Sequence, residues 1–233
     1  HIRILLSIIR SGTVFVDKQN IALINAIGMT SLAHKALDGG LSSFERVAQF
    51  AKSLPYVTEV RYITNSDSVL DGDYAKASIT SNTPEALLDT FPTENFADIF
   101  YMYADCPFLD SNITEGLYGR HEQYLSHYSF ADGYPYGLVP EILSVEIVPK
   151  LRSLSAECAG PIDRESLFTV LQEDINAFDV ETELSPIDQR LLRVSLTADT
   201  LRNFTILRRI MAAGGNDATT ITTILEERHD LLR

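Results

Sequence analysis

An acidic residue, Asp105, follows an apolar run at residues 97–103 in which Asp98 is the only charged side chain. Such a run is typical of a strand that is buried on both faces of a parallel sheet. Ligands of open α/β sheets bind at the carboxyl ends of the strands, where a carboxylate can hold Mg²⁺ against phosphate oxygens. Asp105 is therefore a candidate metal ligand. The alternative is that Asp105 and Asp110, which flank Pro107, serve only as turn and helix-cap residues.

The elements around Asp105 alternate between strands and helices. The sequence predicts strands at residues 13–16, 21–26, 57–64, 75–80 and 97–103, and helices at residues 42–53, from 83 onward, and at 113–125. The second of these helices has three start signals, with Thr83 at the N-cap, Pro84 at the first helical position and Glu85 in the first turn. This order implies right-handed crossovers and a mostly parallel sheet, which is an α/β fold.

The second half of the chain has a weaker pattern. We expect an aromatic turn at residues 132–137, strands at 141–144, 178–183 and 193–196, and helices at 145–154, 161–174, 199–211 and 217–233. Pro149 lies inside the first of these helices, and Gly214 and Gly215 end the third. We interpret residues 130–190 as an insertion on the acceptor side of one domain that spans residues 1–213.

Composition limits the class of protein. The chain has 233 residues, 45% of them hydrophobic, which suits one large α/β domain or two small ones. A net charge of −13 argues against a nucleic-acid partner, and no apolar run approaches the roughly 18 residues of a membrane span. Cys106 and Cys158 match neither a disulfide framework nor a zinc pattern. We interpret the chain as a cytoplasmic protein without a nucleic-acid or membrane partner.

Two sets of side chains also have ordinary explanations. His121 and His127 have no acid or Cys at metal-ligand spacing, so we expect surface or core hydrogen bonding. Five tyrosines could form a stacking platform for a base or sugar, or could simply pack: Tyr118, Tyr124, Tyr128, Tyr134 and Tyr136.

Four stretches in the same order resemble the nucleotide-diphospho-sugar transferase superfamily, which has a Rossmann-like three-layer GT-A fold. They most closely resemble its cytidylyltransferase branch, which includes CMP-KDO synthetase and the spore coat polysaccharide synthesis proteins. The stretches are residues 26–37, 104–110, 134–141 and 196–200, within a resemblance that covers about residues 21–212. The stretch at 104–110, Ala-Asp-Cys-Pro-Phe-Leu-Asp, is the most specific.

The resemblance implies a nucleotide site in the loop after the first strand. In that family the loop wraps a triphosphate with backbone N–H groups, and Arg and Lys side chains neutralise the phosphates. Carried over, Gly28, Thr30, Ser31 and Lys35 are the nucleotide-binding residues, and Lys35 is the catalytic cation. Ser31 stands where the family has its loop Arg, so a planar clamp for phosphate is missing.

The resemblance also implies a metal and an acceptor. Mg²⁺ would be held by Asp105 and Asp199, with the triphosphate completing its coordination. In the acceptor pocket Glu141 is retained. Two other acids of the family's pocket are replaced here by Tyr136 and Val139, so the resemblance does not identify the acceptor molecule. In this chemistry a sugar hydroxyl or carboxylate attacks the α-phosphate, and the protein supplies positioning and charge stabilisation.

Two functions from different classes remain. The first is a Mg²⁺-dependent nucleotidyltransferase that joins a nucleoside triphosphate, CTP by resemblance, to a sugar or sugar acid with release of pyrophosphate, as in polysaccharide biosynthesis. The second is a GT-A domain that has lost catalysis and binds a nucleotide, a nucleotide-sugar or a partner. Such a domain resembles the front end of the spiro-SPASM proteins, where it precedes a radical-SAM enzyme. Residues 214–233 would then be a helix leading into a further domain, and a homodimer is left open.

Overall fold

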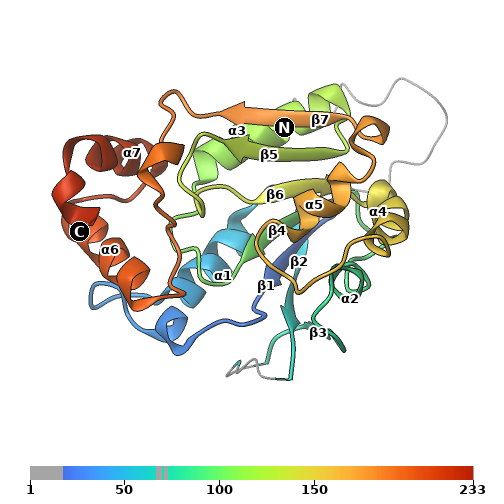
Figure 1. The fold of residues 1–233 in the computed structure, drawn as a ribbon, viewed down its shortest axis with the longest axis horizontal. Helices are drawn as coiled ribbons and strands as arrows, with labels where there is room; N and C mark the ends of the chain where they lie inside the picture. Colours follow the sequence, from blue (N-terminus) through green and yellow to red (C-terminus); the bar gives the residue numbers. More distant parts are fainter. Residues whose placement is uncertain (1–17, 67–69, 71–72, 233) are drawn as a thin grey trace.

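The structure is a computed structural model that describes residues 18–66, 70 and 73–232 (Figure 1). The strand expected at residues 13–16 lies outside the described residues. The described part of the chain forms a central sheet with helices on both faces, which confirms the three-layer α/β prediction.

Seven strands form this sheet in the order β3-β2-β1-β4-β6-β5-β7. The neighbours pair in parallel except that β6 is antiparallel to both β4 and β5. The strands are β1 (Asn20–Asn25), β2 (Val57–Thr64), β3 (Lys76–Ser78), β4 (Asp98–Tyr103), β5 (Tyr128–Asp132), β6 (Glu141–Ser144) and β7 (Val180–Leu184). The mostly parallel sheet that the sequence predicts is therefore confirmed.

Strands β1 and β4 form the centre because their sequences are apolar on both faces. Every residue of β1 is buried, and β4 is buried up to its last residue, Tyr103. Leu23 pairs in register with Tyr101, and successive side chains of a strand point to opposite faces. Because the two strands are parallel, their carboxyl ends lie next to each other at the same edge of the sheet.

Helices cover the two faces of the sheet in separate cores. One face packs against α1 and α3, and the other packs against α2, α4 and α5. A third core joins α6 and α7 to the loops at the end of the sheet, at the left in Figure 1. The helices are α1 (Ser43–Ser53), α2 (Pro84–Leu88), α3 (Ser111–Tyr124), α4 (Val148–Ser155), α5 (Ser166–Gln172), α6 (Leu201–Ala212) and α7 (Ala218–Glu227).

The helix starts follow from local chemistry. Ser42 forms a capping box with Glu45 at α1, and Thr83 caps α2 with Pro84 in its first turn. Asp110 caps α3, where its Oδ1 accepts from the Ile113 amide at 2.9 Å. The start of α2 confirms the prediction from Thr83 and Pro84, and Asp110 is the helix cap that its alternative interpretation expects.

The structure differs from the sequence-based elements mainly after residue 125. The short strand β5 was not expected, and the helix expected at 145–154 is divided because Pro149 lies in the first turn of α4, after the 3-10 turn Val145–Ile147. The helix expected at 161–174 is shorter and begins only at Ser166. The segment 193–196 is not a strand, since Arg193 is left-handed and Ser195 makes only an isolated bridge to Tyr136.

The second half of the chain contributes strands to the central sheet and helices to its cores. Residues 130–190 supply strands β6 and β7 of the sheet as well as α4 and α5. α7 is capped by Asp217 and ends at Glu227, earlier than the expected helix 217–233. No helix in the described part of the chain has both the length and the apolar character needed to cross a bilayer.

Candidate active site

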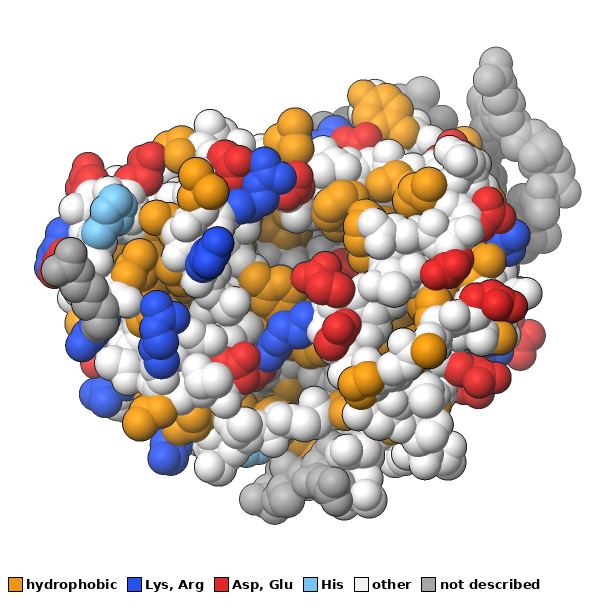
Figure 2. All heavy atoms as spheres, in the orientation of Figure 1, with side chains coloured by type: hydrophobic (Ala, Val, Ile, Leu, Met, Phe, Trp, Pro, Cys, Tyr) orange, Lys and Arg blue, Asp and Glu red, His pale blue; other side chains and the backbone are white. Residues whose placement is uncertain are grey.

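The loops that follow β1 and β4 meet at the carboxyl ends of these two strands. β1 ends at Asn25 and leads into the Gly28 loop, and β4 leads directly into Asp105. Figure 2 shows a hollow in the middle of this face, with acidic and basic side chains gathered around it. This is the edge at which open α/β sheets bind their ligands.

Asp105 and Asp199 converge on one guanidinium group at this edge. Arg164 donates from Nη1 to Asp105 Oδ1 at 3.1 Å and from Nη2 to Asp105 Oδ2 at 2.6 Å. The same Nη2 lies 3.5 Å from Asp199 Oδ2. The two acids predicted as metal ligands, 94 positions apart in sequence, thus reach the same small volume, and a cationic nitrogen lies between them.

Two tyrosine rings hold the Arg164 side chain. Its guanidinium carbon lies 4.8 Å from the ring centre of Tyr103 and 5.3 Å from that of Tyr136, which are cation–π distances. The Tyr103 hydroxyl donates to the Asp163 carbonyl at 2.9 Å and fixes the loop before α5. Burial alone would lower the pKa of Arg164, but hydrogen bonds and charge from Asp105 raise that pKa above its ordinary value, so the group is a permanent cation.

Asp199 is oriented by the first turn of α6. Asn203 Nδ2 donates to Asp199 Oδ1 at 2.9 Å and to Thr197 Oγ1 at 3.2 Å. Burial raises the pKa of Asp199, but the bonds from Asn203 and Thr197 and the charge of Arg164 outweigh burial, so the net pKa is lowered. Asp199 is therefore an ionised carboxylate with a fixed direction.

The segment before Asp199 is tied to both loops. The Ala198 amide donates to the Asp105 carbonyl at 2.8 Å, and the Thr30 hydroxyl donates to the Ala198 carbonyl at 3.2 Å. Thr30 also caps the 3-10 turn Ser31–His34 by accepting from Leu32 N. Thr30, predicted as a phosphate ligand, thus contributes to the scaffold of the site in this structure.

A cavity of about 130 Å³ opens between these groups. Gly28, with φ at +68°, lies on its wall with Asp105, Arg164 and Asp199. Its lining residues are Asn25, Ile27, Gly28, Met29, Tyr103, Asp105, Ile162, Asp163, Arg164 and Asp199. Arg164 is the only Lys or Arg side chain of that lining.

Of the four predicted nucleotide residues, only Gly28 lines this cavity; Thr30, Ser31 and Lys35 do not. Ser31 and Lys35 are exposed at the start and end of the 3-10 turn. The cation that the structure brings to the acids is Arg164, not Lys35.

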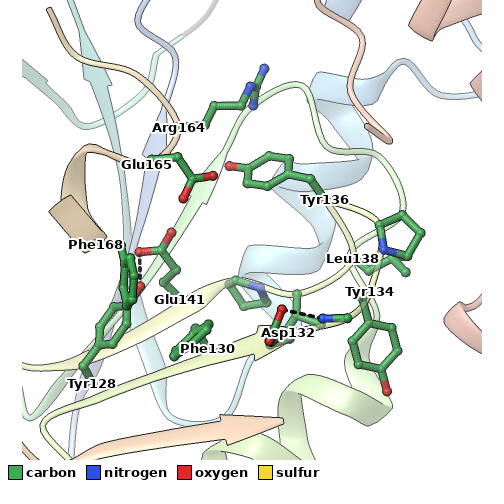
Figure 3. Close-up of a pocket in the computed structure, with 16 residues that line it drawn as sticks. Tyr128, Phe130, Asp132, Tyr134, Tyr136, Leu138, Glu141, Arg164, Glu165 and Phe168 are labelled. Carbon is green, nitrogen blue, oxygen red and sulfur yellow. Dashed lines mark hydrogen bonds between the residues drawn. The ribbon is translucent and has the colours of Figure 1, made fainter. Parts of the chain in front are cut away.

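A second and larger cavity, of about 470 Å³, lies on the other side of Arg164 and contains the predicted acceptor residues Tyr136 and Glu141 (Figure 3). Tyr128, from β5, donates from its hydroxyl to Glu141 Oε2 at 2.9 Å. Burial raises the pKa of the Glu141 carboxyl to about 8; the bond from Tyr128 opposes that rise, and the charge of Glu165 adds to it.

The histidine prediction is confirmed at the opposite end of β4. His121 is buried, with Nδ1 2.7 Å from Ser129 Oγ and Nε2 3.4 Å from Asp98 Oδ1. Lys18 Nζ lies 2.8 Å from Asp98 Oδ2 and completes a core ion pair. This cluster is separate from the site at Asp105. Among the five tyrosines, Tyr118 belongs to this packing, whereas Tyr128, Tyr134 and Tyr136 line the large cavity.

Asp105 and Asp199 could supply two of the oxygen ligands of a hard cation such as Mg²⁺, and the remaining ligands would have to come from water or substrate. The described residues contain no group of three or more His, Cys, Asp or Glu side chains arranged for a metal. Two carboxylates are nevertheless the usual protein contribution to Mg²⁺, which keeps waters and takes phosphate oxygens for its remaining positions. The nitrogen of Arg164 between the two carboxylates shows that this position suits a positive charge.

Similarity to known proteins is stronger in structure than in sequence. No protein-family model matches the chain. An uncharacterized protein of Treponema pallidum (strain Nichols) is 42% identical over 59 residues, which are 25% of this chain and 27% of that protein. That match spans about a quarter of the relative's length, so it indicates no function.

Solved structures share the fold over most of the chain. A cytidylyltransferase from Leptospira borgpetersenii serovar Hardjo-bovis has a TM-score of 0.73 at 17% identity, over 92% of this chain and 97% of that chain. The chain has the cytidylyltransferase fold. CMP:2-keto-3-deoxy-manno-octonic acid synthetase complexed with CTP gives 0.56 at 10% identity, over 84% and 100%. A manganese complex of Rv0371c from Mycobacterium tuberculosis H37Rv gives 0.50 at 11% identity, over 72% and 88%.

The cytidylyltransferase fold confirms the predicted resemblance at the level of architecture. The further likeness to spiro-SPASM proteins stays a prediction. Sequence reasoning missed Arg164, because the sequence predicts one helix over residues 161–174 and so places Arg164 within it. It also missed Asn203. Asn203 follows Asp199 by four positions at the start of a helix, and side chains four positions apart there can form a hydrogen bond.

Proposed function

We propose that this protein is a nucleotidyltransferase that transfers the nucleotidyl group of a nucleoside triphosphate, CTP by its fold, to a small sugar-type acceptor. The observation that carries the proposal is the convergence of Asp105 and Asp199 on one cationic nitrogen beside the Gly28 loop. The known structures of this fold include a CTP complex and a manganese complex, which supports a nucleotide and a divalent cation as ligands.

The chain's own residues would divide the work of this reaction. Asp105 and Asp199 would hold Mg²⁺ or Mn²⁺, and a bound divalent cation would supply neutralisation of phosphate charge. Gly28 permits close approach of the backbone to the triphosphate. Arg164, as the cation in the cavity lining, would contact the phosphates and replace the missing loop Arg at Ser31. Lys35 stays a proposed phosphate ligand that would reach in from the rim.

The bond changes are those of in-line displacement. An acceptor oxygen forms a bond to the α-phosphorus while the bond from that phosphorus to the bridging oxygen of the β-phosphate breaks, which releases pyrophosphate. We call the cavity lined by Gly28, Asp105 and Asp199 the metal-side cavity. The acceptor would occupy the cavity of Tyr136 and Glu141, because Arg164 lines both cavities. A cytoplasmic location, where nucleoside triphosphates are abundant, fits this reaction.

A binding module without catalysis is the second candidate. Arg164 already pairs with both acids, so a metal ion has to displace it, and the loop Arg is replaced by Ser31. Both features favour a domain that binds a nucleotide or a nucleotide-sugar through Arg164 alone.

Thermal unfolding with ligands separates the candidates. CTP, UTP, GTP and ATP are each added with and without Mg²⁺ or Mn²⁺; a ligand at 100 times its Kd adds about 2.7 kcal/mol to the free energy of unfolding. Stabilisation by CTP that requires the metal, together with pyrophosphate release in the presence of sugar acceptors, supports the transferase. Metal-independent stabilisation without pyrophosphate release supports the binding module. Stabilisation by none of the four rejects the transferase and leaves only the second candidate, as a domain that binds a nucleotide-sugar.

Two variants test the ligand assignment. Asp105→Asn should abolish the metal dependence of nucleotide binding. Asp188→Asn is the matched control, because Asp188 is an exposed acid that also pairs with an arginine, Arg190. Metal dependence that survives in Asp105→Asn would refute Asp105 as a ligand.

A further inference from the structure

The large cavity differs from the metal-side cavity in its chemistry. Five of its sixteen lining residues are aromatic and three are acidic, Asp132, Glu141 and Glu165 (Figure 3). Arg164 closes one end, where the two cavities meet. A substrate that reacts at the metal side would therefore place its reacting oxygen near Arg164 and extend the rest of its structure toward Glu141.

Two carboxylates face the interior of this cavity. Glu141 extends from the start of β6 and Glu165 from the residue before α5, and in Figure 3 their carboxyl groups approach each other. Within the described residues, neither forms an ion pair with Lys, Arg or His. Asp132, at the rim, is paired with Arg190 at 3.2 Å, and the charge of Arg164 is shared by Asp105 and Asp199.

Among the described residues, Glu141 has no cationic partner, and the one Lys or Arg side chain that lines this cavity, Arg164, is paired with Asp105 and Asp199. Facing Glu141 are Glu165 and the hydroxyl of Tyr128, and the hydroxyls of Tyr101 and Tyr103 on β4 and of Tyr136 in the aromatic turn also lie within its field. A carboxylate placed beside Glu141 would be repelled by Glu165, and the lining cation Arg164 already neutralises Asp105 and Asp199, so burying that carboxylate here is costly.

The aromatic walls add a second feature. The rings of Tyr128 and Phe130 lie 5.6 Å apart, and those of Phe130 and Phe168 lie 5.4 Å apart. These rings and the two carboxylates line the same cavity. Ring faces next to carboxylates attract organic cations, through cation–π contact and charge together.

We propose that the acceptor carries an ammonium group and that the cavity of Glu141, Glu165 and the rings of Tyr128, Phe130 and Phe168 binds this group. That the bound ligand is the acceptor of the reaction rests on the proposed function. The binding of an ammonium group in this cavity does not depend on catalysis. It excludes a sugar acid as the preferred acceptor, which the family resemblance had left open.

Three isosteric probes test the cation site directly. Choline, 3,3-dimethylbutanol and 3,3-dimethylbutanoate share a shape and differ in charge, and their binding to the full chain is measured by calorimetry or by ligand-observed NMR at millimolar concentrations. We expect choline to bind at least about tenfold more tightly than the neutral alcohol, a difference of about 1.4 kcal/mol, and the carboxylate to bind least. Equal affinities for choline and the alcohol, or no binding of choline, would overturn the proposal.

Two variants assign the effect to the carboxylates. Above the pKa of Glu141 of about 8, where Glu141 is ionised, Glu141→Gln and Glu165→Gln should each reduce the choline-to-alcohol affinity ratio about threefold to tenfold and leave the affinity for the alcohol unchanged. Glu157→Gln, an exposed acid outside the cavity lining, is the control and should leave the ratio unchanged. An unchanged ratio in both cavity variants would reject the site.

The affinity for choline should also depend on pH. Cation binding favours the ionised form of Glu141, so the affinity should rise between about pH 6 and pH 8 and level off above the pKa of about 8. The alcohol should show no such rise. Because these measurements need neither nucleotide nor metal, failure of the cation site leaves the nucleotide test of the proposed function intact, and failure of nucleotide binding leaves the cation site standing.

Discussion

The guanidinium of Arg164 and the carboxylate of Asp105 form a two-bond ion pair, with distances of 3.1 Å and 2.6 Å, at the position we propose for a divalent cation. The Asp105 side chain is 8% exposed and that of Arg164 27%. The pair is therefore largely shielded from water, and any cation that binds Asp105 must compete with Arg164.

Replacing Arg164 by Gln should make this competition visible. Without metal, Asp105 and Asp199 would lose their shared cation, and the variant should lose about 2 kcal/mol of stability, less than a fully buried pair because Arg164 is partly exposed. Mg²⁺ or Mn²⁺ should then stabilise the variant more than the original protein, with an apparent affinity at least about tenfold higher. The measurement is thermal unfolding over a metal titration.

The control for this variant is Arg190→Gln. Arg190 also pairs with two acids, Asp132 and Asp188, but on the surface, so its loss should change stability much less than the loss of Arg164 and leave the metal affinity unchanged. Weaker metal binding in Arg164→Gln would show that Arg164 supports the cation instead of competing with it.

Replacing Asn203 by Ala should weaken the metal site indirectly. Asn203 orients Asp199 and lowers its pKa through a 2.9 Å hydrogen bond. Partners that orient a ligating group commonly change metal affinity by about 10- to 100-fold, and we expect a loss in that range for Mn²⁺, measured by calorimetry. Thr205→Ala, on the same helix, removes only a bond to the Leu201 carbonyl and should leave the affinity unchanged. Equal effects of the two variants would assign the loss to general damage of α6.

The sequence indicated the strand ends and helix caps of this site because those signals are local. The apolar run before Asp105, the cap at Asp110 and the Thr83-Pro84 start all depend on neighbouring residues and agree with the structure. Asp199 was assigned only through family resemblance, since nothing near it in sequence indicates that it reaches Asp105.

The rest of the site depends on contacts between distant residues. Arg164 belongs to a loop that Tyr103 fixes from 61 positions away, and no local pattern separates it from a surface arginine of a helix. The strand β5 is short and lies near the edge of the sheet, so its residues lack the long apolar run that identified β1 and β4. The proposed acceptor cavity, which β5 lines through Tyr128 and Phe130, was therefore predicted only in part, through Tyr136 and Glu141 and through Tyr128 and Tyr134 as possible stacking residues.

Gly28 and Gly39 offer a matched test of the nucleotide loop. Both have φ at +68°, and a Cβ at either would meet no atom within 4 Å, so each change to Ala should cost about 1 kcal/mol through backbone strain alone. Only Gly28 lines the metal-side cavity. We expect Gly28→Ala to weaken nucleotide binding about tenfold and Gly39→Ala to leave it unchanged, as measured by calorimetry. Equal nucleotide affinities in the two variants would remove the Gly28 loop from the binding site.

Glu141→Gln should change how stability depends on pH. The pKa of Glu141 rises from 4.5 to about 8 on folding, so between these values the folded protein keeps a proton that the unfolded chain releases. Stability therefore falls as pH rises through this window, by up to about 1.4 kcal/mol per pH unit from this group. Gln does not titrate and can still accept the bond from Tyr128. The variant should match the original protein near pH 4 and become progressively more stable than it toward pH 8, as measured by denaturant unfolding. A difference that stays constant, as expected for the exposed control Glu157→Gln, would mean that Glu141 is already ionised at neutral pH and that its burial costs little.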